Sequence, residues 1–590
     1  MINTVASPVS GTISELRIGN NSIITETTVI CYVESMKMEY EIKGEVSGRI
    51  VAVNVAVGSQ ISTGDVICTI DTSEQAESIE PQSAKEEDLP DFDLLAKRNE
   101  LYLSQAARLR GDRRKGELTA LERIELLFDD GSFEEYGRFA IAAQRRRRDY
   151  DDLVDRTQND GVITGIGTVE GTPVATICYD YDVLAGTQGL QNHRKLDRII
   201  DITSRLRIPL VTFADGGGGR PGDSDGFVPT GLEVSSFAEL AKLAKKVPHI
   251  AIVSGYTFAG NAALAAVADL MIGTEGLSMG MGGPAMIEGA GLGTFHPSEV
   301  GPIHIHEESG AIDIRATDMT DAIGLCKQIL GLITNKVTTP TDASATIDLN
   351  SVVPQKRGRT FDLDLIIDGV SDATTKIELK AKFGRNLRTF LTRVEGVSAV
   401  IMANDSRHLA GAIDRDAADK ATFAYKIASK LQLPIISLID TPGFVVGPAA
   451  EATGGVRSFG QLFIEGACCQ SELIAIVIRR GYGLGAMAMT KGSFKEALKT
   501  ISWPTGEFGG MGPEGAVRLG YRKELEAIAD PTLREAKYNE LLEALLRSTS
   551  ALSLADAFEI DDVILPNNTR ATIKRLLGRP NGDSLDPSGL

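Results

Sequence analysis

One lysine near the N-terminus has the surroundings of a residue that is chemically modified. Lys37 lies between Met36 and Met38 in the stretch ESMKME (34–39). Short alternating apolar runs, separated by Gly, Asn and Ser, flank this stretch and predict strands joined by turns. A turn side chain projects into solvent, where its amine is open to a modifying group. An ordinary exposed lysine in a hairpin is the alternative.

Two glycine-rich segments could stabilise developing negative charge. The first reads DGGGGR (215–220) and the second reads GYGLGA (481–486). Where bulky side chains are missing, main-chain N–H groups can point at a carbonyl oxygen, and a pair of them stabilises the negative charge that grows there. Both segments therefore predict oxyanion holes. The candidate donors are the N–H groups of Gly217, Gly218, Gly485 and Ala486.

Other catalytic signatures are weaker or missing from the sequence. Residues 217–222 also match G-x-G-x-x-G, but a lone match is weak evidence for a dinucleotide site and Pro221 fits such a loop poorly. The sequence holds no nucleophile elbow, phosphate loop or H-E-x-x-H motif. His304-Ile305-His306 is interpreted as a strand or loop surface, and no metal site is predicted. Cys468-Cys469 is expected to belong to the core.

A short internal repeat builds the element that carries Lys37. Two segments return 37 residues later with nearly the same residues: VSGTI (9–13) as VSGRI (46–50), and VIC (29–31) as VIC (66–68). Two similar halves of short strands predict one small all-β sandwich or flattened barrel over residues 1–72. Lys37 lies between the halves. Residues 73–92 are polar, acidic and proline-bearing, and we expect a flexible linker there.

A longer repeat, with an offset of 225 residues, covers most of the remaining chain. Val169-Glu170-Gly171 returns as Val394-Glu395-Gly396, Lys195 as Lys420, and Asp215 as Asp440. Amphipathic helical patterns followed by buried strands predict an α/β fold in each copy. The body is therefore a duplicated domain. Its two halves are predicted to span residues 93–345 and 346–590.

Composition limits the class of protein. The formal net charge of −19 argues against binding to nucleic acid or to an anionic membrane. The N-terminus shows no signal sequence, and no run approaches the roughly 18 apolar residues of a membrane span, so a cytoplasmic protein is expected. The six cysteines form no C-x-x-C pair and are expected to be buried free thiols.

The N-terminal region resembles the biotin carboxyl carrier domains. ESMKME is similar to their biotin attachment motif, and SPVSG (7–11) matches as well. The resemblance implies that Lys37 carries covalent biotin, flanked by Met36 and Met38, and that a biotin protein ligase attaches it. A lipoyl domain shares the fold, but its lysine usually lacks the two methionines. One departure is the family's first Gly-Asp turn, which here reads Glu26-Thr27-Thr28.

The body resembles the carboxyltransferase subunit of acyl-CoA carboxylases of the propionyl-CoA and acetyl-CoA type, a double crotonase-like fold. Four stretches carry the resemblance: 160–171, 439–451, 479–489 and 502–518. By motif, Gly217 and Gly218 match the pair that holds the thioester oxygen of acyl-CoA. Gly485 and Ala486 match the pair that holds the ureido oxygen of biotin, with Leu484 interpreted as a one-residue insertion. Other implied contacts are Arg220, Pro442, Gly443 and Phe444 around the pocket, and Met487 and Ala488 where acyl size is tuned.

Together the resemblances imply an acyl-CoA carboxylase subunit that carries biotin and transfers its carboxyl group to the α-carbon of an acyl-CoA. The implied partners are the acyl-CoA, a separate ATP-dependent biotin carboxylase, and further copies of this chain in a hexameric ring. Two alternatives remain open: a biotin-dependent decarboxylase or transcarboxylase, and a non-catalytic carrier and assembly subunit. The small Ala488 allows propionyl-CoA or a larger acyl group, and acetyl-CoA remains possible.

Overall fold

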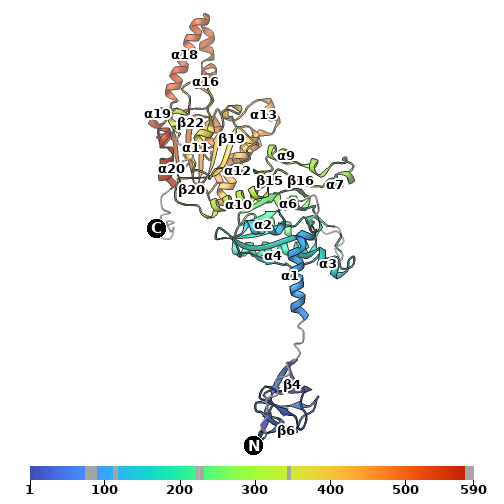
Figure 1. Cartoon of the computed structure of the whole chain (residues 1–590). Coiled ribbons are helices and arrows are strands. Elements are labelled where there is room, and N and C mark those ends of the chain that lie inside the picture. Colours follow the sequence, from blue (N-terminus) through green and yellow to red (C-terminus); the bar gives the residue numbers. More distant parts are fainter. Residues whose placement is uncertain are drawn as a thin grey trace. The chain divides into compact units, whose positions relative to one another are not determined.

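The computed structural model describes residues 1–73, 90–109, 117–220, 222–223, 225, 232–341 and 347–577. The chain divides into two compact units, Met1–Leu95 and Ala96–Leu590. Figure 1 shows the first as a small β structure and the second as a large α/β structure. Most of the predicted linker, and the predicted boundary between the halves of the body, lie outside the described residues.

The first unit consists of two four-stranded sheets around one apolar core. The strand orders are β1-β8-β6-β3 and β5-β4-β2-β7, so each sheet takes strands from both copies of the 37-residue repeat. Two glycines show how closely the copies agree: a Cβ on Gly11 would lie 2.3 Å from the Glu34 oxygen, and one on Gly48 would lie 2.5 Å from the Asp71 oxygen. The strands are β1 (Ile2–Ala6), β2 (Gly11–Leu16), β3 (Ile23–Ile24), β4 (Val29–Ser35), β5 (Met38–Lys43), β6 (Gly48–Val53), β7 (Gln60–Ile61) and β8 (Val66–Asp71).

The first half of the second unit is built on a seven-stranded mixed sheet in the order β17-β15-β13-β12-β11-β10-β9. The strands of this sheet are β9 (Glu134–Tyr136), β10 (Val162–Val169), β11 (Thr172–Tyr179), β12 (Leu210–Phe213), β13 (His249–Val253), β15 (Leu270–Thr274) and β17 (Ile314–Ala316). Strands β14 (Tyr256–Phe258) and β16 (Ser278–Gly280) pair in a separate two-stranded sheet. The helices of this half are α1 (Pro90–Leu109), α2 (Ala120–Leu127), α3 (Tyr150–Arg156), α4 (Leu190–Leu206), α5 (Ser236–Leu243), α6 (Gly260–Ala266), α7 (Pro284–Gly289), α8 (Pro297–Val300), α9 (Ile303–Glu308) and α10 (Met319–Thr334).

The second half repeats this plan in a sheet with the order β18-β19-β20-β21-β22-β23-β25, and β24 pairs with β22. Its strands are β18 (Ile377–Leu379), β19 (Leu387–Val394), β20 (Val397–Asn404), β21 (Ile435–Thr441), β22 (Leu473–Tyr482), β23 (Lys499–Ser502), β24 (Glu507–Gly509) and β25 (Asp562–Val563). Its helices are α11 (Leu363–Val370), α12 (Arg415–Leu431), α13 (Pro448–Ala452), α14 (Gly455–Cys468), α15 (Gly483–Ala488), α16 (Pro513–Gly520), α17 (Arg522–Ala527), α18 (Pro531–Ser548), α19 (Ala551–Asp556) and α20 (Thr569–Leu577).

The duplication extends to individual backbone angles. Non-glycine residues with positive φ recur at the predicted offset of 225: Glu170 and Glu395, Leu184 and Leu409, Ala185 and Ala410, and Arg207 and Gln432. A positive φ is strained for such residues, so the backbone must be held there by its surroundings. The two halves therefore share their loop geometry as well as their order of strands and helices.

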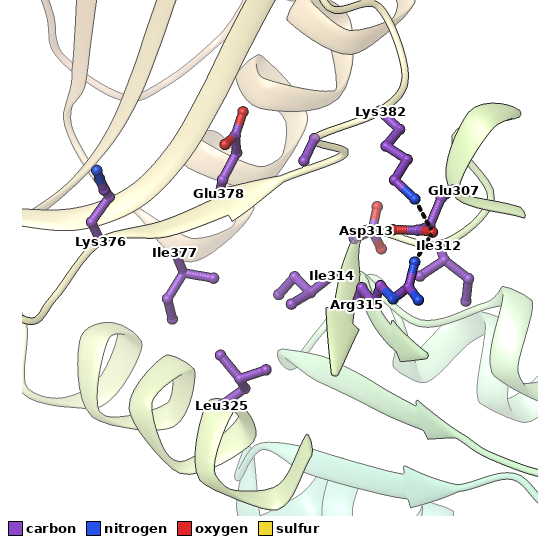
Figure 2. Close-up of a pocket in the computed structure, with 11 residues that line it drawn as sticks. Glu307, Ile312, Asp313, Ile314, Arg315, Leu325, Lys376, Ile377, Glu378 and Lys382 are labelled. Atoms are coloured by element: carbon purple, nitrogen blue, oxygen red, sulfur yellow. Dashed lines mark hydrogen bonds and ion pairs between the residues drawn. The ribbon is translucent and has the colours of Figure 1, made fainter. Parts of the chain in front are cut away.

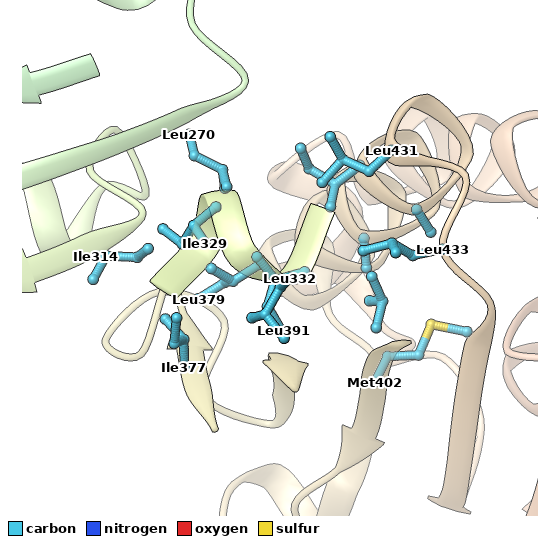
Figure 3. Close-up of a cluster of buried hydrophobic side chains, with 14 of the residues drawn as sticks. Leu270, Ile314, Ile329, Leu332, Ile377, Leu379, Leu391, Met402, Leu431 and Leu433 are labelled. Atoms are coloured by element: carbon cyan, nitrogen blue, oxygen red, sulfur yellow. The ribbon is translucent and has the colours of Figure 1, made fainter. Parts of the chain in front are cut away.

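Helix α10 joins the halves through one continuous apolar core. Figure 3 shows Ile329 and Leu332 of α10 between apolar residues of both sheets, including Leu270 and Ile314 of the first half and Leu391 of the second. Removing this much apolar surface from water is the main force that holds the halves as one unit.

Several sequence predictions need correction. Helix α1 begins at Pro90, inside the predicted linker. His304 and His306 lie on helix α9, not on a strand or loop. Cys468 is exposed, whereas the other five cysteines are buried, and all six are free.

Among the described residues, no helix is long and apolar enough to cross a membrane.

Candidate active site

Lys37 lies on a tight turn at the tip of the β4–β5 hairpin. Ser35 and Met38 pair across the two strands, which leaves Met36 and Lys37 as the loop. Both loop residues have positive φ, 52° and 67°, as a type I′ turn requires. The turn matches the right-handed twist of its strands, so it presents the lysine at a defined point.

The surroundings of Lys37 suit covalent attachment of a cofactor. The side chains of Met36 and Met38 are 97% and 65% exposed, and Lys37 is exposed as well. In the part of the chain that the structure describes, no carboxylate pairs with the Lys37 ammonium. Its amine is therefore accessible to an enzyme that would modify it.

The first glycine segment follows strand β12 and is closely bonded within the protein. The Gly217 N–H donates to the Ala185 oxygen at 3.1 Å, and the Gly218 N–H donates to Asn261 Oδ1 at 3.0 Å. Asn261 belongs to the first turn of α6. A substrate oxygen at Gly218 would therefore share that N–H with Asn261 or displace the amide oxygen.

The 225-residue repeat matches the first glycine segment to the loop at Pro442 and Gly443, which is separate from the second glycine segment at 481–486. Pro442 and Gly443 follow strand β21, and the Gly443 oxygen accepts the Ile413 N–H at 3.0 Å. The first half has the same bond, from the Gln188 N–H to the Gly218 oxygen at 2.8 Å. The 225-residue repeat thus places Gly443 where the first half has Gly218.

Helix α15 brings Gly485, part of the second glycine segment, against the Pro442-Gly443 loop. A Cβ on Gly485 would lie 2.8 Å from Gly443 Cα, so only glycine allows the two backbones to approach this closely. Gly485 lies in the first turn of α15, where N–H groups lack acceptors within the helix, and Ala486 follows at the start of the next turn. The first turn of α15, with its N–H groups, therefore packs directly against the Pro442-Gly443 loop.

Leu484 has a counterpart in the first half, whereas its interpretation as an insertion relative to the family's pattern stays a prediction. Tyr482 and Phe258 end equivalent strands, because Tyr482 pairs with Gly509 of β24 and Phe258 pairs with Gly280 of β16. The next residue has positive φ in both halves, 60° at Gly483 and 50° at Ala259. Leu484 thus corresponds to Gly260, and relative to the first half it is no insertion.

Arg220 is held inside the protein. Its Nη2 lies 2.5 Å from Asp160 Oδ1 and its Nε lies 2.8 Å from Asp223 Oδ1, and its side chain is almost fully buried. Charge-assisted bonds of this kind fix a guanidinium in one orientation. Arg220 is therefore placed to hold the loop around Gly218, and its charge is already matched by carboxylates.

The residues expected to tune acyl size differ in exposure. Ala488 is fully buried and its carbonyl accepts the Tyr425 hydroxyl at 2.9 Å, whereas Met487 is 37% exposed. Nearby, Phe444 stacks on Phe459 with ring centres 4.1 Å apart. Met487 can therefore contact a ligand at this surface of the chain, while Ala488 acts through packing.

A separate cavity of about 260 Å³ lies at the junction of the two halves. Figure 2 shows Glu307 between Arg315 and Lys382, to which it is bonded at 2.9 and 2.8 Å. The Glu307 carboxylate thus lies between two cations, and its bond to Lys382 links the two halves. None of the predicted site residues lines this cavity, and the described residues contain no cluster that could hold a metal ion.

Comparison with known protein families decides the family. The family model described as carboxyl transferase domain matches residues 112–578, and the model described as biotin-requiring enzyme matches residues 20–70. The chain belongs to the carboxyl transferase domain family. Its N-terminal unit is a biotin-requiring domain, which indicates covalently attached biotin as the cofactor, and the exposed amine at the β4–β5 turn fits that attachment.

Named relatives of this carboxyl transferase agree with that assignment. The chain is 29% identical over 486 residues to the propionyl-CoA carboxylase beta chain of Saccharopolyspora erythraea, a match that covers 78% of this chain and 87% of the relative. It is 30% identical over 479 residues to the methylmalonyl-CoA carboxyltransferase 12S subunit of Propionibacterium freudenreichii subsp. shermanii, covering 78% and 88%.

Two solved structures resemble the carboxyl transferase in three dimensions. One is a single-chain, multi-domain long-chain acyl-CoA carboxylase, with a TM-score of 0.76 and 40% identity over 98% of this chain. The present chain spans only 56% of that protein. The other is the transcarboxylase 12S hexamer, with a TM-score of 0.73 and 28% identity, covering 86% of this chain and 96% of the other. These matches confirm the predicted biotinyl domain and the crotonase-like carboxyltransferase fold.

Sequence reasoning missed several side chains around the glycine segments of the carboxyl transferase. Asn261 bonds the first segment, and Tyr482, Glu507 and Arg357 form a bonded group beside the second. The repeat could have pointed to Asn261, because the equivalent position in the second half is Gly485. No sequence signal joins Arg357 to Glu507, since 150 residues separate them.

Proposed function

We propose that this chain is the carrier and carboxyltransferase component of an acyl-CoA carboxylase. In this proposal Lys37 bears biotin, and the body transfers the carboxyl group to the α-carbon of an acyl-CoA. The observation that carries the proposal is the presence, in one chain, of an exposed lysine on the turn of a biotin-requiring domain and of a glycine segment in each half of a duplicated carboxyl transferase body.

The two glycine segments would each serve one oxygen that becomes negative during transfer. Biotin supplies a nitrogen that carries the carboxyl group and, once free, can take a proton. We assign the thioester oxygen of the acyl-CoA to the first segment, at Gly217 and Gly218. We assign the ureido oxygen to Gly485 and Ala486, beside Pro442, Gly443 and Phe444. Fixed N–H groups stabilise such charge, and in the first segment the substrate oxygen would share them with the Ala185 oxygen and Asn261 Oδ1, to which they donate in this structure.

Arg220 and Ala488 take supporting roles in this proposal. Arg220 holds the first segment through Asp160 and Asp223 instead of meeting substrate charge directly. Ala488 sets the packing of α15, and Met487 contacts the acyl group or biotin. The flexible thioether of Met487 would adapt to acyl groups of different length.

The acyl group proposed is propionyl or longer, and acetyl-CoA remains an alternative. A relative is named a propionyl-CoA carboxylase beta chain and a structural neighbour a long-chain acyl-CoA carboxylase. We further propose a homohexamer, since the neighbouring 12S transcarboxylase is described as a hexamer. An ATP-dependent biotin carboxylase and a biotin protein ligase are the other proposed partners. A cytoplasmic location and the domain limits at residues 72, 92 and 345 stay predictions.

A transcarboxylase or decarboxylase is the second candidate, because the 12S relative is named a methylmalonyl-CoA carboxyltransferase. The two candidates differ in the source of the carboxyl group. ATP-driven carboxylation by a complex purified with this chain would favour the carboxylase. Transfer from a carboxyacyl-CoA to a second acceptor, without ATP, would favour the transcarboxylase.

The test uses the biotinylated full-length chain without partners. It is incubated with malonyl-CoA, methylmalonyl-CoA and longer carboxyacyl-CoAs, and loss of the carboxyl group is followed. Loss that disappears in the Lys37→Arg variant would support the proposal and rank the acyl groups. No loss from any thioester, in a folded and biotinylated chain, would refute transfer and leave a carrier and assembly role.

A further inference from the structure

A bonded network surrounds the second glycine segment, and part of it comes from a distant loop. Asp440, the next-to-last residue of β21, is completely buried and pairs with Arg479 at 2.7 Å and with Arg480 at 2.7 Å. Both arginines lie near the end of β22, just before α15 begins. Asp440 therefore ties the strand that leads to Pro442 and Gly443 to the strand that leads to Gly485.

The loop before α11 attaches to this pair through its main chain. Arg479 Nη1 donates to the Arg357 oxygen at 3.1 Å and to the Arg359 oxygen at 2.6 Å. The Arg479 guanidinium also lies over the Phe361 ring, 5.0 Å from its centre. The loop thus contacts the buried Arg479 guanidinium, which also bonds Asp440.

The side chain of Arg357 reaches the start of α15 by a second route. Its Nε and Nη2 bond Glu507 at 2.5 and 2.7 Å in a two-pronged contact, and its Nη1 bonds Glu514 at 3.0 Å. Glu507 also accepts the hydroxyl of buried Tyr482 at 2.6 Å. Tyr482 is the residue directly before α15. Arg357 therefore contacts both ends of the connection to α15: its carbonyl accepts from Arg479, and its side chain holds Tyr482 through Glu507.

We propose that Arg357 is a positioning residue for the second glycine segment, which sets the spacing between residues 441–443 and the first turn of α15. The proposal rests on the function proposed above. Gly485 already lies so close to Gly443 that a Cβ would touch it at 2.8 Å, so a small shift of either segment changes the geometry of the N–H groups. Catalytic constellations lose activity when supporting residues let them move by fractions of an ångström.

The described residues of the first half hold the equivalent aspartate in another way. The residue equivalent to Asp440 is Asp215, which bonds Arg123 at 2.9 Å and the Ser254 hydroxyl at 2.6 Å. Arg123 comes from helix α2, and the Asn261 side chain links the first turn of α6 to Gly218 directly. In the second half Gly485 stands where the first half has Asn261, so no side chain at that position can hold the start of α15. Arg357 holds it instead, through Glu507 and Tyr482.

The first test compares Arg357→Gln with Arg388→Gln in the biotinylated full chain. Arg388 is a matched control because it makes the same kind of two-pronged contact, to Glu378 at 2.8 and 2.7 Å, and a further bond to Asp364 at 2.7 Å. We expect Arg357→Gln to lower kcat for biotin-dependent loss of carboxyl from methylmalonyl-CoA by about 10- to 100-fold. KM for the thioester should stay unchanged, because the first segment is untouched. Equal kcat in the two variants, or a change in KM alone, would overturn the proposal.

A second measurement does not depend on activity. Amide hydrogen exchange at Thr441, at Gly443 and at residues 482–486 should be faster in Arg357→Gln than in the wild-type chain and in Arg388→Gln. Unchanged exchange overturns the positioning role. If exchange is faster in Arg357→Gln but the wild-type chain shows no carboxyl transfer, the positioning role is upheld and the proposed function is refuted. The measurement thus distinguishes failure of the positioning proposal from failure of the proposed function.

A third measurement tests the route through Tyr482. If Arg357 acts through Glu507 and the Tyr482 hydroxyl, Arg357→Gln and Tyr482→Phe share part of their effect. The double variant should then lose less exchange protection at 482–486 than the sum of the two single losses. Purely additive losses would contradict this route. Arg357→Lys should not restore protection, because an ammonium cannot form the two-pronged contact, and full restoration by lysine would also overturn the proposal.

Discussion

The two halves of the body have nearly the same backbone but hold their glycine segments in different ways. In the first half, one side chain, Asn261, bonds the Gly218 N–H. In the second half, glycine replaces that side chain at position 485 and the two backbones touch directly. Duplication therefore preserved the strands and strained loops, whereas the groups that fill each site diverged. Two sites with the same frame can then serve two different oxygens.

The largest expected effect is the loss of stability when the buried carboxylate of either half, Asp440 or Asp215, is removed. Asp440→Asn leaves Arg479 and Arg480 without their shared buried partner, so we expect it to lower the free energy of unfolding by about 3–5 kcal/mol. Asp215→Asn should cost less, because the structure places Asp440 in salt bridges with two arginines and Asp215 in a salt bridge with Arg123. Urea denaturation of the two variants measures the comparison. An equal or reversed order would mean that the networks are energetically equivalent.

The next effect concerns the close contact of the second segment. Gly485→Ala places a Cβ 2.8 Å from Gly443 Cα and should lower carboxyl transfer about 100-fold. Gly218→Ala should also be severe, since its φ is 87° and the new Cβ would lie 2.7 Å from the Ala259 Cβ. Turnover of a carboxyacyl-CoA by the folded variants gives the result.

Gly219→Ala is the control for both glycine variants, because a Cβ at Gly219 would meet no atom within 4 Å. Its turnover should stay close to that of the wild-type chain. A strong loss in Gly219→Ala would show that the segment cannot tolerate any side chain, and the argument from close contact would then be wrong.

Two buried lysines allow the halves to be compared through pH. Burial lowers the pKa of Lys420 to about 7 and that of Lys195 to about 8, from the ordinary lysine value of 10.5. Between these values the unfolded chain binds more protons than the folded one, so the unfolding free energy rises with pH, by up to about 1.4 kcal/mol per pH unit for each lysine.

Lys420→Met should remove the part of this rise that begins near pH 7, and Lys195→Met the part that begins near pH 8. Denaturation midpoints at a series of pH values check both. The same pH dependence in wild type and variants would mean that the lysines stay charged, held by the carbonyl oxygens they contact, which are those of Lys380 and Phe383 for Lys420.

The smallest effect comes from the repeat in the carrier unit. The Ser62 N–H donates to the Asp65 carboxylate at 2.7 Å, and the equivalent Thr25 N–H donates to the Thr28 hydroxyl at 2.9 Å. Thr28→Asp would make the second bond charge-assisted and should stabilise the unit by about 0.5 kcal/mol. A thermal unfolding scan of the full chain tests it, and a lower midpoint would show that the turns are not equivalent.

Much of the architecture follows from local patterns that the sequence displays directly. The 37-residue repeat and the ESMKME motif indicated the β unit and placed Lys37 on a turn, because strand alternation and turn residues act over a few neighbours. The 225-residue repeat indicated the duplicated α/β body. The start of α18 is also set locally, because Asp530 caps its first N–H groups and Pro531 occupies its first turn.

What only the tertiary structure decided is how distant side chains complete each site. The bonding of Arg220 to Asp160, of Gly218 to Asn261 and of Arg357 to Glu507 joins residues between 43 and 150 positions apart. The burial of Ala488 and the exposure of Met487 likewise depend on how α15 packs. Periodicity and motifs report a residue's own neighbourhood, whereas burial and pairing are set by which segments the folded chain brings together, and that information lies in no single stretch of sequence.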